Sequence, residues 1–271
     1  MNRTHRSKFI WAAAGLAVFW RLASPWMQQR AVDAEVISQS DHTMFVTLGI
    51  MGLGFVACGV LAFRWAGTQA AWIFALHAAF SGLHWGGPLG TSREAWVVYL
   101  FLSAFIGAAL LLHFMLLFPR PLAAASRRST WFLLYTPLAA SALVVLAVVA
   151  LPGGDNGNGG LMPAFWVLHL LVPNFYSLLG IAIVVARFAR ATPDERRTDG
   201  LSFLLLGMVL GVLPYLGVLA ADAAGVVLPG GSQPYNLFFL LMPMGCCAAI
   251  LRQRLAERGR RGTIYISCGY W

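Results

Sequence analysis

The stretch AWVVYLFLSAFIGAALLLHFMLLF, residues 95–118, decides the fold. It contains no Asp, Glu, Lys or Arg and is longer than the roughly 20 apolar residues that a helix needs to cross a bilayer. A barrel strand would be about 10 residues long and would alternate apolar and polar side chains. Similar runs rich in Leu, Ala, Val and Phe recur along the chain. We therefore predict an all-α protein, a polytopic bundle of membrane-spanning helices.

The composition agrees with a lipid environment. Of the 271 residues, 59% are hydrophobic and 11% are charged, and the mean hydropathy is +0.72. A soluble domain carries roughly 25% charged residues, so a water-facing surface of ordinary size is excluded. The net charge of +9 does not indicate nucleic acid, because the basic residues are spread over loops and no aromatic–basic RNA-binding pattern is present.

The apolar runs predict about eight spans, and prolines at 173, 214 and 243 are expected to kink the last three. The predicted spans are residues 9–27, 43–63, 70–85, 95–118, 131–151, 163–187, 201–221 and 234–251. The first is either an uncleaved signal-anchor helix, which we favour, or a cleaved signal peptide. The Gly- and Asn-rich segment 152–160 is predicted to be an unstructured loop.

Charge predicts the orientation. With the N-terminus in the cytoplasm, 16 of the 19 basic residues fall in cytoplasmic segments, and only Arg21, Arg30 and Arg93 fall outside. Both ends are thus predicted to be cytoplasmic, in a multi-pass protein of the cytoplasmic (inner) membrane. The predicted organisation is a cytoplasmic start with the signal-anchor helix (1–30), a bundle of seven further helices (31–254) and a cytoplasmic tail (255–271). The apolar end of that tail is open to interpretation as the start of a ninth helix in a truncated chain.

Ionisable residues inside membrane spans are functional candidates, and here they are histidines. His77 and His84 are seven residues apart, so they share one face of the third span, and Trp85 adjoins them. His169 lies near the outer end of the sixth span. Three interpretations stay open: packing between helices, ligand or proton sensing, and metal or haem ligation. With the polar residues beside Pro173, the candidate ligand-binding set is His77, His84, Trp85, His169, Asn174 and Tyr176.

Catalytic and metal sites have no support in the sequence. It contains no His-Glu-x-x-His string, nucleophile elbow, phosphate loop or paired carboxylates, so we predict no catalytic residue, no metal site and no cofactor. Acidic residues are nearly absent from the spans and no internal repeat is visible, which weakens a transporter interpretation. A small-molecule transporter or permease stays the alternative function, followed by a haem or metal redox protein of the membrane.

Two glycine pairs predict close helix packing. Gly82 with Gly86, and Gly207 with Gly211, each place two small residues on one helix face. This spacing allows two helix backbones to approach within a membrane.

Three strings occur in order along the chain. His113-Phe-Met-Leu-Leu-Phe-Pro119 closes the fourth span, Ala191-Thr-Pro-Asp-Glu-Arg-Arg197 precedes the seventh, and Ala249-Ile-Leu-Arg-Gln-Arg-Leu255 ends the eighth. Together they resemble the membrane sensor module of multi-pass bacterial sensor histidine kinases of the quorum-sensing receptor type. The resemblance covers about residues 95–261. It departs from the family at Ala256-Glu257-Arg258, where an Asp-Ile-Asp string is usual, and the kinase domain is absent from this chain.

The resemblance implies a membrane-embedded, non-catalytic sensing module of a two-component signal transduction system. It implies a hydrophobic or peptide signal bound in the outer half, and a homodimer if the parent protein is a histidine kinase. Helix movement would pass to a cytoplasmic output domain that this chain lacks. The partners expected are the lipid bilayer and the signal, with no nucleic acid. The residues that carry the motifs and would transmit the signal are His113, Phe118, Pro119, Pro214, Pro243, Arg252 and Arg254.

Overall fold

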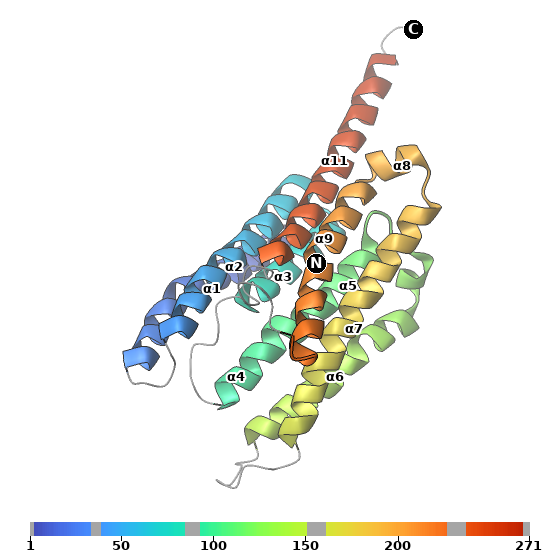
Figure 1. Cartoon of the computed structure of the whole chain (residues 1–271). Helices are drawn as coiled ribbons and strands as arrows, with labels where there is room; N and C mark the ends of the chain where they lie inside the picture. The colour runs from blue at the N-terminus through green and yellow to red at the C-terminus, as the bar shows by residue number, and fades with distance from the viewer. Residues whose placement is uncertain (1–2, 34–38, 85–92, 151–160, 227–236, 268–271) are drawn as a thin grey trace.

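A computed structural model describes residues 3–33, 39–84, 93–150, 161–226 and 237–267, which form helices joined by short turns (Figure 1). These residues contain no strand, so the all-α prediction is confirmed for them. Trp85, the predicted loop 152–160 and the end of the predicted tail, 268–271, lie outside the described residues.

The helices follow the predicted apolar runs closely. Their bounds are α1 (Arg3–Asp33), α2 (Gln39–Ala66), α3 (Gln69–His84), α4 (Arg93–Leu100), η1 (Phe101–Ile106), α5 (Gly107–Leu117), η2 (Ala123–Ser126), α6 (Arg128–Ala150), α7 (Leu161–Arg190), α8 (Pro193–Thr198), α9 (Leu201–Ala223), η3 (Leu237–Leu240) and α11 (Leu241–Ser267). Lipid offers no hydrogen-bond partner, so each apolar run satisfies its backbone groups within its own helix.

Six helical segments in the described part are long and apolar enough to cross a membrane. They are Gly49–Ala66, Val97–Leu117, Arg128–Ala150, Pro163–Arg190, Leu201–Val218 and Leu237–Gly259. The first and third predicted spans are too short to be counted among these six. The apolar part of α1 covers only Ser7–Phe19, and α3 has 16 residues. The chain is therefore a helical membrane protein, while the count of eight and the cytoplasmic placement of both ends stay predictions.

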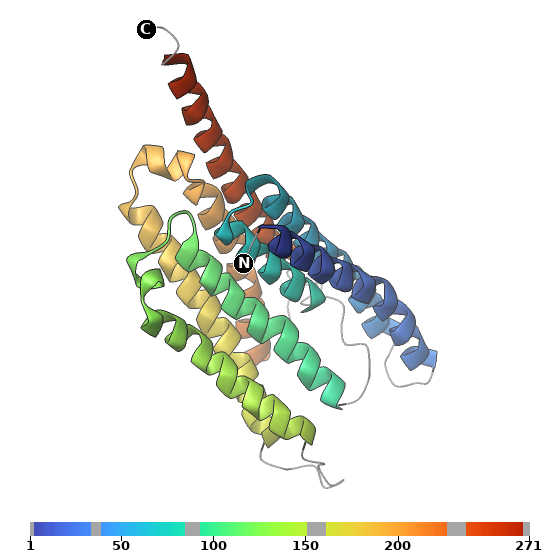
Figure 2. The ribbon, with the colours of Figure 1, turned by 180° about the vertical axis from the view of Figure 1, so that it is seen from behind.

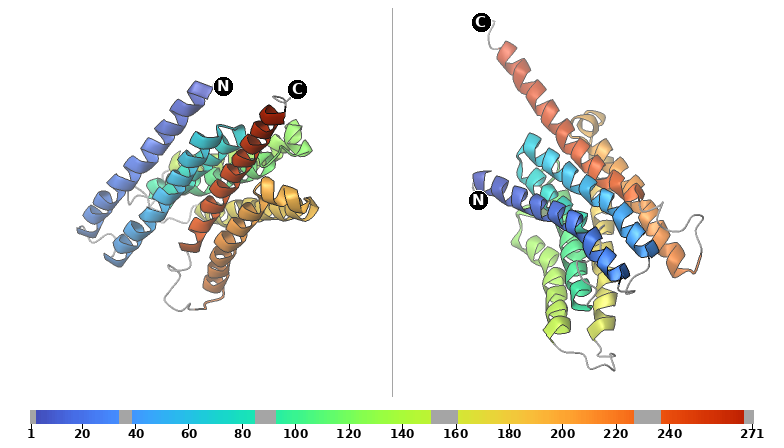
Figure 3. Two further views of the ribbon diagram at one scale, coloured as in Figure 1. Left: turned by 90° about the horizontal axis from the view of Figure 1, so that it is seen from above. Right: turned by 90° about the vertical axis from the view of Figure 1, so that its left-hand side faces the viewer.

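Six helices pack in a closed ring. Each contacts the next in the order α2, α3, α5, α7, α9, α11 and back to α2. Helix α1 lies outside the ring against α2 and α3, and α6 lies outside it against α5 and α7 (Figures 2 and 3). This ring places side chains from distant parts of the sequence around one interior.

The run 95–118 is not one uniform helix. Its middle, η1, is a π-helix that joins α4 to α5. A π-helical turn inserts an extra residue into the helix and is common near functional sites. The run ends where predicted: Leu117 closes α5, and Phe118 is extended before Pro119, which has no N–H to continue the helix.

Helix α11 differs from its prediction at both ends. It begins at Leu241, so Pro243 lies in its first turn, where the missing N–H costs no hydrogen bond, and not in the helix interior. Its other end continues as one helix to Ser267, so residues 255–267 are helical. Figures 1 and 2 show this end of α11 projecting beyond the rest of the bundle.

Close packing at the predicted glycines is confirmed where the structure describes them. A Cβ added to Gly207 would lie 2.7 Å from Cα of Gly245, so α9 and α11 touch backbone to backbone. A Cβ on Gly82 would lie 2.9 Å from the carbonyl oxygen of Gly52 on α2. Gly86 lies outside the described residues.

Candidate functional site

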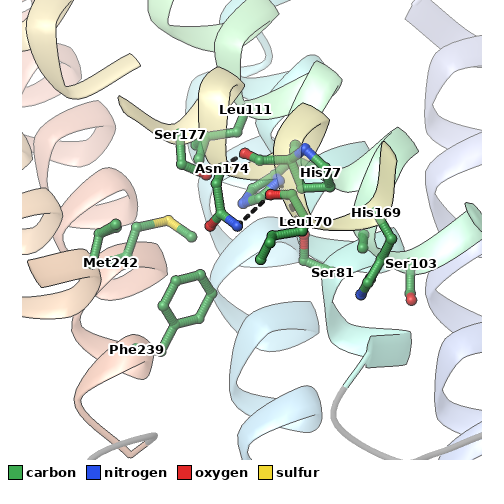
Figure 4. Close-up of a pocket in the computed structure, with 14 residues that line it drawn as sticks. His77, Ser81, Ser103, Leu111, His169, Leu170, Asn174, Ser177, Phe239 and Met242 are labelled. Atoms are coloured by element: carbon green, nitrogen blue, oxygen red, sulfur yellow. Dashed lines mark hydrogen bonds between the residues drawn. The ribbon is translucent and has the colours of Figure 1, made fainter. Parts of the chain in front are cut away.

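The ring encloses a pocket of about 250 Å³, which we call the α7 pocket (Figure 4). This volume is just under the roughly 300–1,000 Å³ usual for small-molecule sites. Five of the six ring helices or their short extensions line it. The lining residues are His77, Ser81, Ser103, Ala104, Ala108, Leu111, His169, Leu170, Pro173, Asn174, Ser177, Val212, Phe239 and Met242.

His77 is deeply buried in the pocket wall, with 2% of its surface exposed. Its Nδ1 lies 2.8 Å from the carbonyl oxygen of Gly107 and 3.1 Å from Oγ of Ser81. A carbonyl oxygen only accepts hydrogen bonds, so Nδ1 carries the proton and donates it. In the neutral ring Nε2 is then a bare acceptor, and this buried atom has no hydrogen-bond partner among the described residues.

The short distance between His77 and α5 depends on Gly107. A Cβ at this position would lie 2.6 Å from Oγ of Ser81. Gly107 directly follows the π-helix η1, which carries Ser103. The π-helical turn and the glycine that allows α3 to pack closely are therefore adjacent in the sequence. A side chain at position 107 would therefore force the Ser81 hydroxyl to move away from this wall of the pocket.

The opposite wall is a polar notch in α7 at Pro173. Proline has no N–H, so the carbonyl oxygen of His169, four residues earlier, loses its usual helical donor. Nδ2 of Asn174 donates to the carbonyl oxygen of Leu170 at 2.6 Å, and the hydroxyl of Ser177 donates to that of Pro173 at 2.9 Å. Oδ1 of Asn174 consequently remains free to accept, and in Figure 4 it points toward Met242.

His169 lies among aromatic rings. Its ring stacks on that of Phe165, with centroids 6.1 Å apart, and lies 5.8 Å from that of Phe105. Its Nδ1 is buried without a hydrogen-bond partner in the described part of the chain. The ring thus joins α7 to η1 by packing, and His169 is part of the pocket lining.

The structure brings three of the predicted ligand-binding residues together: His77, His169 and Asn174. Tyr176 is not in the pocket. It is two residues from Asn174, about 200° around the helix, and its hydroxyl donates to the carbonyl oxygen of Leu134 on α6. The side chains of His84 and Trp85 lie outside the described part.

Sequence reasoning missed several lining residues. Ser81 had a visible signal, because it follows His77 by one helical turn. Ser103 had none, since its position depends on the π-helical turn. Phe239 and Met242 looked like ordinary apolar residues of the last span. They matter because they place the start of α11 in the pocket wall.

A second group of polar residues lies where α5, α7, α8 and α11 meet, at the end of the bundle marked by α8 in Figure 1. We call it the α8-end cluster and define it as Arg120, Arg187, Glu195, Asp199 and Gln253. Arg187 donates to three carbonyl oxygens at the end of α5: those of Phe118, Arg120 and Leu116, at 2.5, 2.9 and 3.1 Å. The carbonyl oxygen of Leu116, in the last turn of α5, also accepts from the backbone N–H of Leu122 at 3.0 Å, and Phe118 and Arg120 follow the helix end.

Ion pairs and hydrogen bonds join the other members of the cluster. Arg120 pairs with Glu195 at 3.4 Å and with Asp199 at 3.1 Å. Nε2 of Gln253 on α11 donates to the carbonyl oxygen of Pro119 at 3.0 Å, and Nε of Arg252 donates to that of Arg197 at 3.2 Å. Helix α11 is thus attached to both the α5 end and the α8 segment.

The three strings that carry the family resemblance meet at this cluster. Pro119 ends the first, Glu195 and Arg197 belong to the second, and Arg252 and Gln253 belong to the third. Elsewhere in these strings, Nδ1 of His113 lies 2.6 Å from the hydroxyl of Tyr135, Phe118 stacks on Phe114, and Arg254 pairs with Glu257. Pro214 lies within α9, as predicted.

Acidification is expected to loosen α8. The backbone N–H of Thr192, then its hydroxyl, and the Arg120 guanidinium hold the pKa of Glu195 below its ordinary value of 4.5. A carboxylate with a lowered pKa in the folded state stabilises it above the unfolded pKa, and the contribution is lost as pH falls through the folded pKa. Hydrogen-exchange protection of residues 193–198 should therefore fall below about pH 4.5.

Glu195→Gln provides the control for this effect, because an amide does not titrate in this range. The variant should show weaker protection of α8 at neutral pH and little further loss on acidification. Equal pH dependence in the variant and the natural protein would contradict the role of Glu195.

No group of three or more His, Cys, Asp or Glu side chains that suits a metal ion is found in the described ranges. Comparisons of the chain with known protein families, with curated proteins and with solved structures found no match.

Proposed function

We propose that this protein is a membrane-embedded sensing module: a small ligand in the α7 pocket alters the position of α11, which carries the change to an output domain beyond this chain. The observation that carries the proposal is the course of α11. One uninterrupted helix begins at Leu241, lines the pocket with Met242, passes the α8-end cluster at Gln253 and projects from the bundle to Ser267 (Figure 1).

Pocket and cluster share three helices. From Met242 to Gln253 the path along α11 is about 16 Å, and from Ser177 to Arg187 along α7 it is about 15 Å. Along α5, Leu111 lies about two turns before the C-terminal end of the helix, where Arg187 donates its hydrogen bonds. Packed helices transmit displacements as rigid elements, so a ligand that moves one wall also strains the hydrogen bonds at the cluster.

Charge supports a cytoplasmic location for the projecting end of α11. Arginines are concentrated on the segments around the α8 end, which fits the retention of basic residues in cytoplasmic loops. They are Arg120, Arg127, Arg128, Arg187, Arg190, Arg196, Arg197, Arg252, Arg254 and Arg258. In this proposal the membrane is the bacterial inner membrane and the output belongs to a two-component system.

The test is a distance measurement between α8 and α11. Spin labels are placed on Asp194→Cys and Arg258→Cys in a background whose four natural cysteines are replaced. Compounds that raise the melting temperature of the purified protein are then added. We expect the label distance to shift by about 2 Å, the size of ligand-driven helix shifts.

A second label pair is the control. Leu16→Cys and Leu61→Cys lie on exposed faces of α1 and α2 and should keep their separation. Stabilising compounds that leave the 194–258 distance unchanged would refute signal transmission. Uptake of the same compounds into proteoliposomes would favour a transporter instead.

A further inference from the structure

The chemistry of the α7 pocket also indicates which ligands it takes, an inference that rests on the proposed function for its biological meaning. His77 determines which hydrogen-bonding group the ligand must carry. Its Nδ1 proton is committed to Gly107 and Ser81, so Nε2 can only accept. Nε2 is buried and has no partner among the described residues, and leaving such an acceptor unpaired is costly.

The rest of the pocket restricts the ligand's charge and polarity. None of the described lining residues is Asp, Glu, Lys or Arg, so a charged ligand would be buried without a counter-ion. A second acceptor, Oδ1 of Asn174, faces the same space from α7. The remaining surface includes Leu111, Val212, Phe239 and Met242, which suit an apolar body.

We propose that the α7 pocket binds a neutral, mainly apolar molecule bearing a hydroxyl or N–H group, which donates a hydrogen bond to Nε2 of His77. The pocket volume of about 250 Å³ limits the ligand to a small molecule or to one inserted portion of a larger one. Ethers, ketones and hydrocarbons of the same shape lack the donor and bind more weakly.

Three probes of similar shape test this requirement on the purified full chain: 4-propylphenol, which donates a hydrogen bond, its methyl ether, which only accepts, and propylbenzene, which does neither. We expect 4-propylphenol to bind about tenfold more tightly than either of the others, the ratio for one buried hydrogen bond. Binding of all three with equal affinity would overturn the proposal, and so would failure of the phenol to bind.

His77→Asn separates the two roles of this residue. The Asn amide reaches the position of Nδ1 and still donates to Gly107, but it presents nothing at the position of Nε2. The variant should lose about tenfold in affinity for 4-propylphenol while propylbenzene binding is unchanged. Equal losses for both probes would mean that His77 only shapes the pocket, which would overturn the proposal.

His113→Asn is the matched control. His113 is also a partly buried helix histidine whose Nδ1 is hydrogen-bonded, but it faces Tyr135 outside the pocket. Its variant should bind all three probes as the natural protein does. The spin-label distance separates this inference from the proposed function, because phenol binding at His77 without movement of α11 refutes sensing and leaves the ligand class intact.

Discussion

Arg187→Met is expected to lower the free energy of unfolding by about 3 kcal/mol, because charged donors to carbonyl oxygens are among the stronger hydrogen bonds of a protein. The guanidinium serves three carbonyls at once, on Leu116, Phe118 and Arg120. Methionine fills a similar volume but donates nothing. The measurement is a denaturant or thermal unfolding curve in detergent, with hydrogen exchange of residues 118–122 as the local readout.

Two further variants define the cause. Arg190→Met changes the same residue type on the same helix, but its side chain is exposed and makes no hydrogen bond or ion pair within the described residues, so stability should be nearly unchanged. Arg187→Lys keeps the charge but lacks the planar fork, and should fall between the two. Similar losses of stability in Arg187→Met and Arg190→Met would contradict this explanation. They would show that the loss of positive charge at this end lowers stability, and not the loss of the Arg187 hydrogen bonds.

Features of this structure that depend on local sequence were predictable, and features that depend on contacts between distant helices were not. Hydropathy predicted the long helices because lipid forces each apolar run to satisfy its own backbone. It could not predict the ring, since the spans are apolar on most faces and carry little information about their neighbours. For the same reason the roles of Phe239 and Met242 became visible only once α11 was placed beside α7 and α9.

The candidate site was predictable only in part. His77, His169 and Asn174 stood out as polar residues within apolar runs, which is a local property. The bond from His77 to Gly107 depends on the contact between α3 and α5, and the π-helix that shapes this contact leaves no clear mark in sequence. Arg187 looked like one of many basic residues at a span end, because its partners are backbone carbonyls, which every residue has.

Gly207→Ala is expected to destabilise the protein by about 2 kcal/mol, within the usual range for overpacking a tight interior. The added Cβ would lie 2.7 Å from Cα of Gly245 and 2.8 Å from the carbonyl oxygen of Leu241. Both atoms are backbone, so no side chain can rotate away and α11 itself must move. Because Gly211, one turn along, already touches Met242, that movement reaches the pocket wall, and 4-propylphenol binding should weaken as well.

Gly217→Ala on the same helix makes this prediction specific. A Cβ at position 217 would meet nothing within 4 Å. Alanine is also a better helix former than glycine by about 1 kcal/mol, so this variant should melt at the same temperature or higher. Opposite signs for the same substitution, ten residues apart on α9, can come only from what faces each position. Equal effects would mean that α9 and α11 are not in backbone contact, and the ring that forms the pocket would then have to be redrawn.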